Sequence, residues 1–173
     1  GNVIYRFAIV TDTHNDNANL AKALSQAKAA NAKFVIGLGD FSDVGTIDEF
    51  KTTKDFFEKS GLPYYTTAGD HDLWDSRNQK LDPLNNYSRV FGSAYSSFAD
   101  SDVRFLIMFD SDGYNGVDQI QRHWIEDELK RNSGNSKLTF IFTSTPLYHP
   151  SSDHTLTKIN DNLKAQADDL INL

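Results

Sequence analysis

The sequence predicts an α/β fold that is built on parallel β-strands. Signals for a strand, a loop and a helix alternate three times along the N-terminal half, with about 30 residues in each unit. Such alternation is typical of parallel strands that are joined by right-handed crossovers. Each of the three predicted strands ends at an aspartate. Because ligands bind at the carboxyl ends of strands in open α/β sheets, these ends are the first candidates for a functional site.

In the N-terminal half, the spacing of hydrophobic residues and the residues that cap or end helices predict where the strands and helices lie. Short runs rich in apolar and β-branched residues predict buried strands, whereas leucine, alanine and phenylalanine at helical spacing predict helices. Asp16 or Asn17 can cap the first helix, and Gly61 ends the second. We therefore expect strands at residues 3–10, 33–38 and 63–67, and helices at residues 17–30 and 46–60.

The C-terminal half is less regular. Residues 73–91 are polar and irregular, which indicates a long loop. Two β-rich runs flank Asp100, Ser101 and Asp102, and this turn composition predicts a hairpin. We expect the hairpin strands at residues 94–99 and 103–109, an amphipathic helix at residues 117–131, a strand at residues 137–143 and a helical stretch at residues 156–173.

Composition excludes several classes of protein. The chain has 173 residues, the length of one domain, and it contains no cysteine, so disulfides, thiolate metal sites and cysteine nucleophiles are excluded. A net charge of −7 argues against nonspecific nucleic-acid binding, which needs clustered lysine and arginine. No apolar run approaches the ~20 residues of a membrane helix. We expect a soluble protein without a membrane partner, cytoplasmic or, if a signal segment was removed, extracytoplasmic.

Most of the acidic residues are aspartates, and three of these follow the predicted strands. Aspartate outnumbers glutamate by 20 to 4. Asp12 and His14 follow the first predicted strand, Asp40 follows the second, and Asp70 and His71 follow the third. Neighbouring strands lie about 4.8 Å apart, so these side chains can converge on one or two metal ions. Carboxylate and imidazole together are a ligand set that suits Zn, Mn and Fe.

The combination of an Asp-x-His, a Gly-Asp-x-x-Asp and a Gly-Asp-His-Asp segment resembles the calcineurin-like metallophosphoesterases, over residues 4–148. The resemblance implies a four-layer α/β/β/α sandwich of two mixed sheets in a single domain. It implies that Asp12 and His14 bind a first metal ion, that Asp40 bridges two ions, and that Asp70 binds the second. His71 would contact the phosphate and help to protonate the leaving group.

The activity that this resemblance implies is metal-dependent hydrolysis of a phosphomonoester or a phosphodiester. A metal-bound hydroxide would attack phosphorus in line, at a centre of two divalent ions of Mn, Fe or Zn. The expected partner is a small phosphate-ester substrate. The sequence identifies neither that ester nor the metal, and it leaves the oligomeric state open.

Three departures from the family put the second metal ion in doubt. Asp70 replaces an asparagine, Ser144 replaces a histidine ligand of the second ion, and the final Gly-His-x-His segment is missing. His149 or His154 could substitute for the missing ligands. Alternatively, the final segment follows Leu173 in a longer chain. We expect the second case, in which this domain lacks its C-terminal part.

Two other functions compete with hydrolysis. A degenerate family member could bind a ligand or partner without turning it over, which the departures at Asp70 and Ser144 would explain. A flavodoxin-like phosphoacceptor domain would also carry carboxylates at its strand ends, but it would leave His14 and His71 unexplained. We expect Asp43 to orient a neighbouring residue or to cap the next helix, and not to bind metal.

Overall fold

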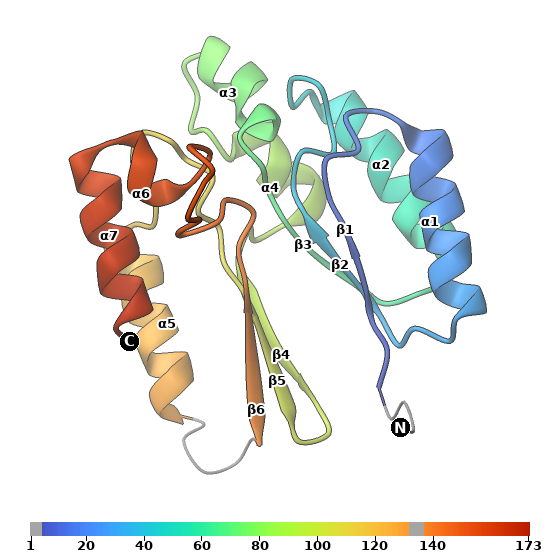
Figure 1. The fold of residues 1–173 in the computed structure, drawn as a ribbon. Helices are drawn as coiled ribbons and strands as arrows, with labels where there is room; N and C mark the ends of the chain where they lie inside the picture. Colours follow the sequence, from blue (N-terminus) through green and yellow to red (C-terminus); the bar gives the residue numbers. More distant parts are fainter. Residues whose placement is uncertain (1–4, 132–136) are drawn as a thin grey trace. The chain divides into compact units, whose positions relative to one another are not determined.

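The structure, a computed structural model, describes residues 5–131 and 137–173. The chain divides into two compact units, Gly1–Ala94 and Tyr95–Leu173, and each unit has its own three-stranded sheet (Figure 1). Both units combine strands with helices, so the predicted α/β class is confirmed. The stacking of these elements into four layers stays a prediction.

The first unit is a parallel α/β unit. In chain order it contains β1 (Ala8–Val10), α1 (Asn17–Ala29), β2 (Val35–Leu38), α2 (Ile47–Ser60), β3 (Tyr64–Thr67), the 3₁₀ turn η1 (His71–Leu73), α3 (Trp74–Asn78) and α4 (Asn85–Phe91). Strand β2 lies between β1 and β3, and both strand pairs are parallel, as predicted. Of the strand expected at residues 3–10, β1 forms only the last part, and residues 1–4 lie outside the described part.

The helix boundaries follow from side-chain caps. Asp16 caps α1, because its carboxylate accepts a hydrogen bond from the backbone N–H of Asn19. Thr46 and Glu49 form a capping box at the start of α2, in which each side chain accepts from the other residue's backbone N–H. Gly61 ends α2 in the left-handed region at φ 70°, where a residue with a Cβ would be strained. Both predicted helices are therefore confirmed to within one residue.

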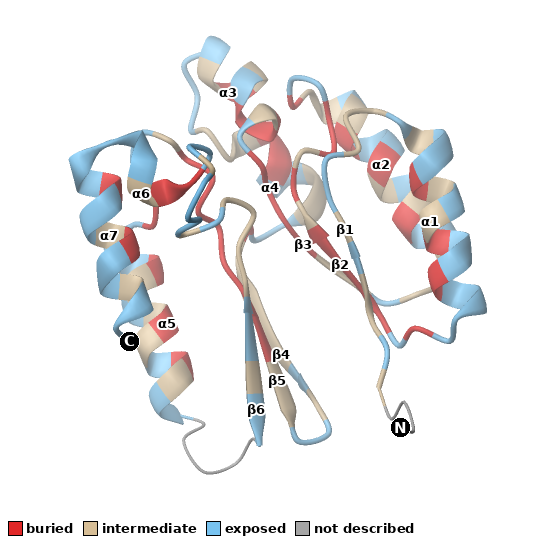
Figure 2. Cartoon of the chain, in the orientation of Figure 1, coloured by how far each residue is buried: buried red, intermediate tan, exposed pale blue. Residues whose placement is uncertain are grey.

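An aromatic cluster forms much of the first unit's core. Phe41, Phe50, Phe57 and Tyr87 are all fully buried. The ring of Phe50 meets that of Tyr87 edge-on at a centroid distance of 5.7 Å, and Phe57 meets Phe41 in the same way. Figure 2 shows buried residues along α2 and α4 and in the sheet of this unit. The cluster fixes the segment after β2, where the candidate site begins.

The prediction of a long loop at residues 73–91 is wrong, because this segment contains α3 and α4. Some of its polar residues form buried tertiary contacts, whereas others, such as Lys80, Asp82 and Arg89, are exposed. Asn86, which is buried, donates through Nδ2 to the Gly45 carbonyl and to the Asp75 carboxylate at 3.1 and 2.7 Å. The Tyr87 hydroxyl donates to the Thr66 hydroxyl at 2.7 Å. Short helices stabilised by such contacts show little hydrophobic periodicity.

The second unit has a mixed sheet. Its elements are β4 (Ser96–Asp100), β5 (Val103–Ile107), α5 (Gln119–Arg131), β6 (Leu138–Phe142), α6 (Leu156–Ile159) and α7 (Asp161–Ile171). The predicted hairpin is confirmed as the antiparallel pair β4–β5, and β6 runs parallel to β5. The expected C-terminal helical stretch is divided at Asn160, whose backbone is extended and whose side chain caps α7.

Helix α5 packs against the rest of the second unit through both apolar and charged contacts. Ile125 lies in a buried cluster with Met108 and Val117. Glu128 is nearly fully buried, and its carboxylate pairs with Arg104 and Arg131. A buried carboxylate needs such partners, because an unpaired charge in the interior is strongly unfavourable.

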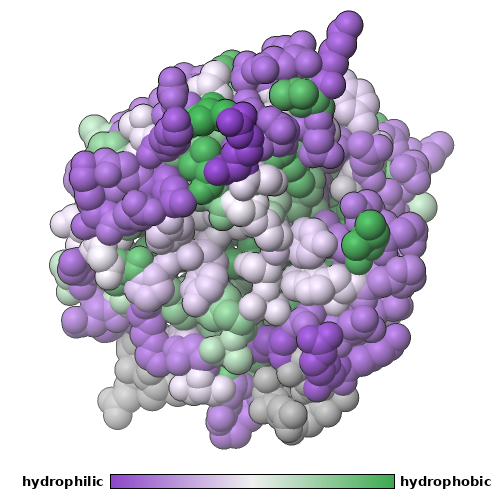
Figure 3. Space-filling view, turned by 180° about the vertical axis from the view of Figure 1, so that it is seen from behind, coloured by the Kyte–Doolittle hydropathy of each residue, from purple (hydrophilic) through white to green (hydrophobic). Residues whose placement is uncertain are grey.

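The described residues contain no helix that is both long enough and apolar enough to cross a membrane. On the face of the molecule shown in Figure 3, hydrophilic residues cover most of the surface, and hydrophobic residues form separate groups.

Asp110 follows β5 and holds the segment after β6. Its Oδ1 accepts hydrogen bonds from the backbone N–H groups of Ser144 and Thr145, at 3.0 and 3.1 Å. Its Oδ2 is buried and has no hydrogen-bond partner among the described residues. Burial therefore raises the pKa of Asp110 to about 7, although the two hydrogen bonds act in the opposite direction.

This pKa predicts that the contribution of Asp110 to stability falls as the pH rises from about 4 to about 7. The Asp110 carboxyl ionises near its ordinary pKa of 3.8 in the unfolded chain, but only near 7 in the folded protein. Within this window ionisation favours unfolding, by up to about 1.4 kcal/mol per pH unit. Asp110→Asn keeps an acceptor for both N–H groups and removes the titration.

Urea denaturation of both proteins at several pH values measures this difference. The free energy of unfolding of the wild type, relative to that of Asp110→Asn, should fall as the pH rises from about 4 to about 7, and the two slopes should agree above about pH 8, where Asp110 is ionised in both states. All other titrating groups are shared, so they cancel in the comparison. Identical slopes across the whole range would show that Asp110 ionises in the folded protein as easily as in the unfolded chain.

Candidate metal centre

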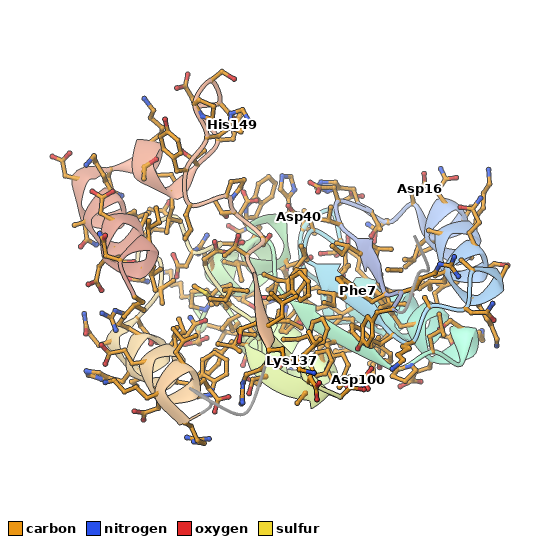
Figure 4. The ribbon with its side chains drawn as sticks, turned by 60° about the horizontal axis from the view of Figure 1, so that its bottom comes forward. Phe7, Asp16, Asp40, Asp100, Lys137 and His149 are labelled. Atoms are coloured by element: carbon orange, nitrogen blue, oxygen red, sulfur yellow. The ribbon has the colours of Figure 1, made fainter. Side chains whose placement is uncertain are left out.

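The candidate centre lies where the three strands of the first sheet end. Val10 of β1 is in register with Gly37 of β2, and Leu38 of β2 with Thr67 of β3, so the strands finish nearly level. The loops that follow them therefore start side by side at one edge of the sheet. Asp40, which comes directly after β2 and Gly39, is labelled in Figure 4.

Backbone hydrogen bonds join the first two loops. The N–H of Asp12 donates to the Gly39 carbonyl at 3.2 Å, and the N–H of His14 donates to the Asp40 carbonyl at 3.0 Å. Asp12, His14 and Asp40 all have positive φ angles, of 52°, 41° and 52°. Left-handed backbone costs a non-glycine residue roughly 1–2 kcal/mol, and such residues cluster at functional sites. The paired loops hold all three residues in this conformation.

Two glycines allow the second and third loops to approach each other. A Cβ atom on Gly39 would lie 2.2 Å from the backbone nitrogen of Gly69. A Cβ on Gly69 would lie 2.3 Å from Oδ1 of Asp40 and 2.4 Å from the Asp40 nitrogen. Both distances are far below van der Waals contact, so only glycine fits at either position. The carboxylate of Asp40 is thus placed directly against the third loop.

Both of these loops donate hydrogen bonds to the side chain of Asp72. It is fully buried. Its carboxylate accepts hydrogen bonds from the N–H groups of Phe41, Ser42 and Gly69 and from the Ser42 hydroxyl, the last at 2.7 Å. Burial raises the pKa of Asp72 to about 6, against the effect of these hydrogen bonds. The position of Asp72 directly after His71 predicts a loop residue or one that supports the ligands, but not which N–H groups it binds.

Three of the predicted ligands converge. Asp12, His14 and Asp40 each offer a ligand atom, and these atoms all lie within 4.8 Å of one another. Ligand bonds to zinc and similar ions are about 2.0–2.2 Å long, so atoms on opposite sides of one ion lie slightly more than 4 Å apart. The donor set of two carboxylates and one imidazole therefore fits a single divalent ion. Asp12 also lines a cleft of about 500 Å³ between β1 and α1, which gives solvent access to this aspartate.

The electrostatics of Asp40 also favour a cation. Burial raises its pKa, and the negative charges of Asp70 and then Asp12 raise it further. The backbone N–H of His71 opposes this shift by donating to Oδ1 of Asp40 at 3.0 Å. Carboxylates that repel each other at short range are stabilised by a bound cation. Asp70 thus lies close enough to Asp40 to affect its ionisation, although it is outside the group of three converging ligands.

His71 and Asp43 face the same region. The Nδ1 atom of His71 is 3.0 Å from the carbonyl oxygen of Asp43, and its ring meets that of His14 edge-on at 4.6 Å. The Asp43 carboxylate is 3.9 Å from Nδ1 of His14 and accepts from Nδ2 of Asn15 at 2.9 Å. Asn15 also donates to Glu49, the capping residue of α2. Asp43 therefore orients its neighbours, as predicted, and the contribution of Asn15 was not anticipated.

The remaining candidates belong to the second unit. Ser144 is half-buried, and its N–H is bound by Asp110. His149 lies in the loop between β6 and α6, where its Nδ1 accepts from the N–H groups of Ser151 and Ser152 (Figure 4). His154 is an exposed residue of the same loop. A role for His149 or His154 as a metal ligand stays a prediction.

Comparisons with known proteins agree with this architecture. A family model described as calcineurin-like phosphoesterase matches residues 5–171. No curated protein was found to match by sequence.

Two solved structures are similar in fold. The protein TT1561 of Thermus thermophilus has a TM-score of 0.57 at 10% identity, covering 97% of this chain and 78% of its own. The purple acid phosphatase PPD1 from seeds of yellow lupin (Lupinus luteus) has a TM-score of 0.61 at 15% identity, covering 88% of this chain. This chain spans only 32% of the length of that phosphatase. The family match over nearly the whole chain shows that this protein belongs to the calcineurin-like phosphoesterases.

Proposed function

We propose that this protein hydrolyses phosphate esters with the help of divalent metal ions. The observation that carries the proposal is the convergence of Asp12, His14 and Asp40 at the ends of β1 and β2. Family membership supports the same class of reaction. A divalent ion at this place, of Mn, Fe or Zn, would act as a Lewis acid toward a phosphoryl oxygen and lower the pKa of a bound water.

The proposal assigns distinct tasks to the protein's own residues. Asp12 and His14 would hold a first ion, Asp40 would serve both this ion and a second one, and Asp70 would be a further ligand of the second. His71 donates a proton to the oxygen of the leaving group. Its Nδ1 is engaged by the Asp43 carbonyl, so Nε2 is the nitrogen that is available to the substrate.

The proposal includes a second ion. Asp40 and Asp70 would supply two carboxylates for it: burial raises the pKa of Asp40, and the negative charge of Asp70 raises it further. A divalent ion at this place would also offset the extra negative charge that Asp70 brings beside an anionic substrate. Elemental analysis of the purified protein distinguishes two ions from one.

The competing function is binding without hydrolysis. It is favoured by Ser144, which stands where the family has a metal-ligating histidine. A binding protein of this kind would hold one ion or none and would retain affinity for a phosphate ester without cleaving it. Turnover and metal content, measured on the same preparation, separate the two functions.

Replacing Asp40 by asparagine should abolish hydrolysis. Asn keeps the shape and tolerates the left-handed backbone at this position, but it removes the charge that would hold the ions. We expect the rate of p-nitrophenyl phosphate hydrolysis with Mn²⁺ to fall by at least about 10³-fold, because the loss of a charged ligand removes several kcal/mol of transition-state stabilisation. A wild type that is inactive with Mn²⁺, Zn²⁺ and Fe²⁺ alike would contradict the enzymatic function itself.

Replacing Gly69 by alanine should weaken metal binding without removing any ligand. The new Cβ would overlap with both Oδ1 and the nitrogen of Asp40, so the carboxylate must move. A ligand displaced by about 1 Å can lower the rate about 10²-fold. We expect the affinity for Mn²⁺, measured by isothermal titration calorimetry, and the rate to fall together.

Gly113→Ala is the matched control for this variant. A Cβ on Gly113 would meet nothing within 4 Å, so Mn²⁺ affinity and activity should stay at the wild-type level. Equal affinities in wild type, Gly69→Ala and Gly113→Ala would show that the close approach of the two loops does not govern the metal site.

A further inference from the structure

The indole of Trp74 lies nearly flat against the imidazole of His71. The ring centroids are 3.8 Å apart and the ring planes differ by 29°. Trp74 is 39% exposed, so filling the core does not account for its place. Together with the edge-on contact of His14, the stack leaves the His71 ring in contact with two other rings.

The stack supplies a restraint that His71 otherwise lacks. The carbonyl of Asp43 can only accept, so the hydrogen bond to it requires a proton on Nδ1 of His71. That single bond anchors one atom of the ring and leaves the ring plane free to tilt about it. A flat aromatic neighbour at 3.8 Å restricts the tilt and so fixes the direction in which Nε2 points.

The backbone around Trp74 is held by contacts on both sides of it, in addition to the hydrogen bond from the Trp74 N–H to the His71 carbonyl. The N–H of Asp75 donates to the Val44 carbonyl at 2.7 Å, and the Asp75 carboxylate accepts from Asn86 at the same distance. On the other side, Leu73 is fully buried. The indole is therefore presented from a fixed turn, and it can act as a support for the imidazole.

We propose that Trp74 is a positioning residue for His71 and fixes the plane of its imidazole toward the leaving group. This inference rests on the proposed function. The oxygen of the attacking water bonds to phosphorus and the water gives up a proton to the solvent. As the bond from phosphorus to the ester oxygen breaks, its electron pair goes to that oxygen, and the proton on Nε2 of His71 is transferred to it. Trp74 takes no part in bonding, but it determines whether Nε2 and the ester oxygen are aligned when the proton moves.

The test is the dependence of the rate on the leaving group. Phenyl phosphate needs a proton donor because phenolate is a poor leaving group, whereas 2,4-dinitrophenyl phosphate leaves without one. With Mn²⁺ present, Trp74→Leu should lower kcat for phenyl phosphate about tenfold, since general-acid catalysis contributes roughly 10²–10⁴-fold and is only partly lost. The KM values, and kcat for 2,4-dinitrophenyl phosphate, should change less than about twofold.

Two further variants control for general damage to the segment. Trp74→Phe keeps a flat ring and should restore most of kcat for phenyl phosphate. Leu81→Ala removes a side chain that is 44% exposed and lies in the same segment, and it should leave the ratio of the two rates at the wild-type value. Equal losses on both substrates in Trp74→Leu, or a Phe variant as impaired as the Leu variant, would overturn the proposal.

A second measurement does not depend on activity. NMR relaxation of the ring C–H bonds reports how firmly the imidazole of His71 is held. These bonds should be rigid in the wild type and more mobile in Trp74→Leu, with Trp74→Phe close to the wild type. The ring of His123, an exposed residue of α5, provides an internal reference that should not change. A His71 ring that is equally rigid in Trp74→Leu contradicts the positioning role. A wild type that cleaves neither substrate contradicts the proposed function, and the NMR result then still decides the role of Trp74.

Discussion

The geometry of the candidate centre depends on one buried carboxylate. Asp72 accepts hydrogen bonds from Phe41 and Ser42 in the loop after β2 and from Gly69 in the loop after β3. These N–H groups would otherwise be buried without partners, which costs about 1–3 kcal/mol for each group. Because Asp72 satisfies them together, the two loops are joined at the point where Gly39 and Gly69 meet. The position of Asp40 follows from this junction, and so does that of His71, whose N–H binds Asp40.

The same edge of the sheet concentrates negative charge. Burial raises the pKa of Asp40, and repulsion by the negative charges of Asp70 and Asp12 raises it further. Such repulsion destabilises the folded protein unless the charges are neutralised by protons or by a cation. A bound ion that prefers the folded state would stabilise it by mass action. Folding and metal binding are therefore expected to be linked in this protein. At these three positions the short side chain of aspartate places the charge closer to the backbone than glutamate would.

Much of the first unit could be predicted because its signals are local. The caps at Asp16 and Thr46 and the left-handed Gly61 define helix boundaries through contacts a few residues apart. The strand ends could be located in the same way, and with them the ligand candidates. The helices α3 and α4 could not, because they are stabilised by contacts from Asn86 to Gly45 and from Tyr87 to Thr66 that lie far apart in the sequence. The stack of Trp74 on His71 belongs to that unpredicted segment. The hydrogen bonds of Asp72 join it to Phe41 and Ser42, which are 31 and 30 residues away in the sequence, so no local pattern predicts them.

The left-handed backbone at Asp12, His14 and Asp40 also limits how this centre could be lost during evolution. Asparagine and glycine adopt this conformation readily, whereas β-branched residues are severely strained in it. Random drift at these positions should therefore pass first through asparagine or glycine, even after selection for metal binding has ended. A descendant without the activity would keep the same loops and carry a recognisable remnant of the motif. Within this family, asparagine or glycine at the positions of Asp12, His14 and Asp40 would identify chains that keep the fold but have lost the activity.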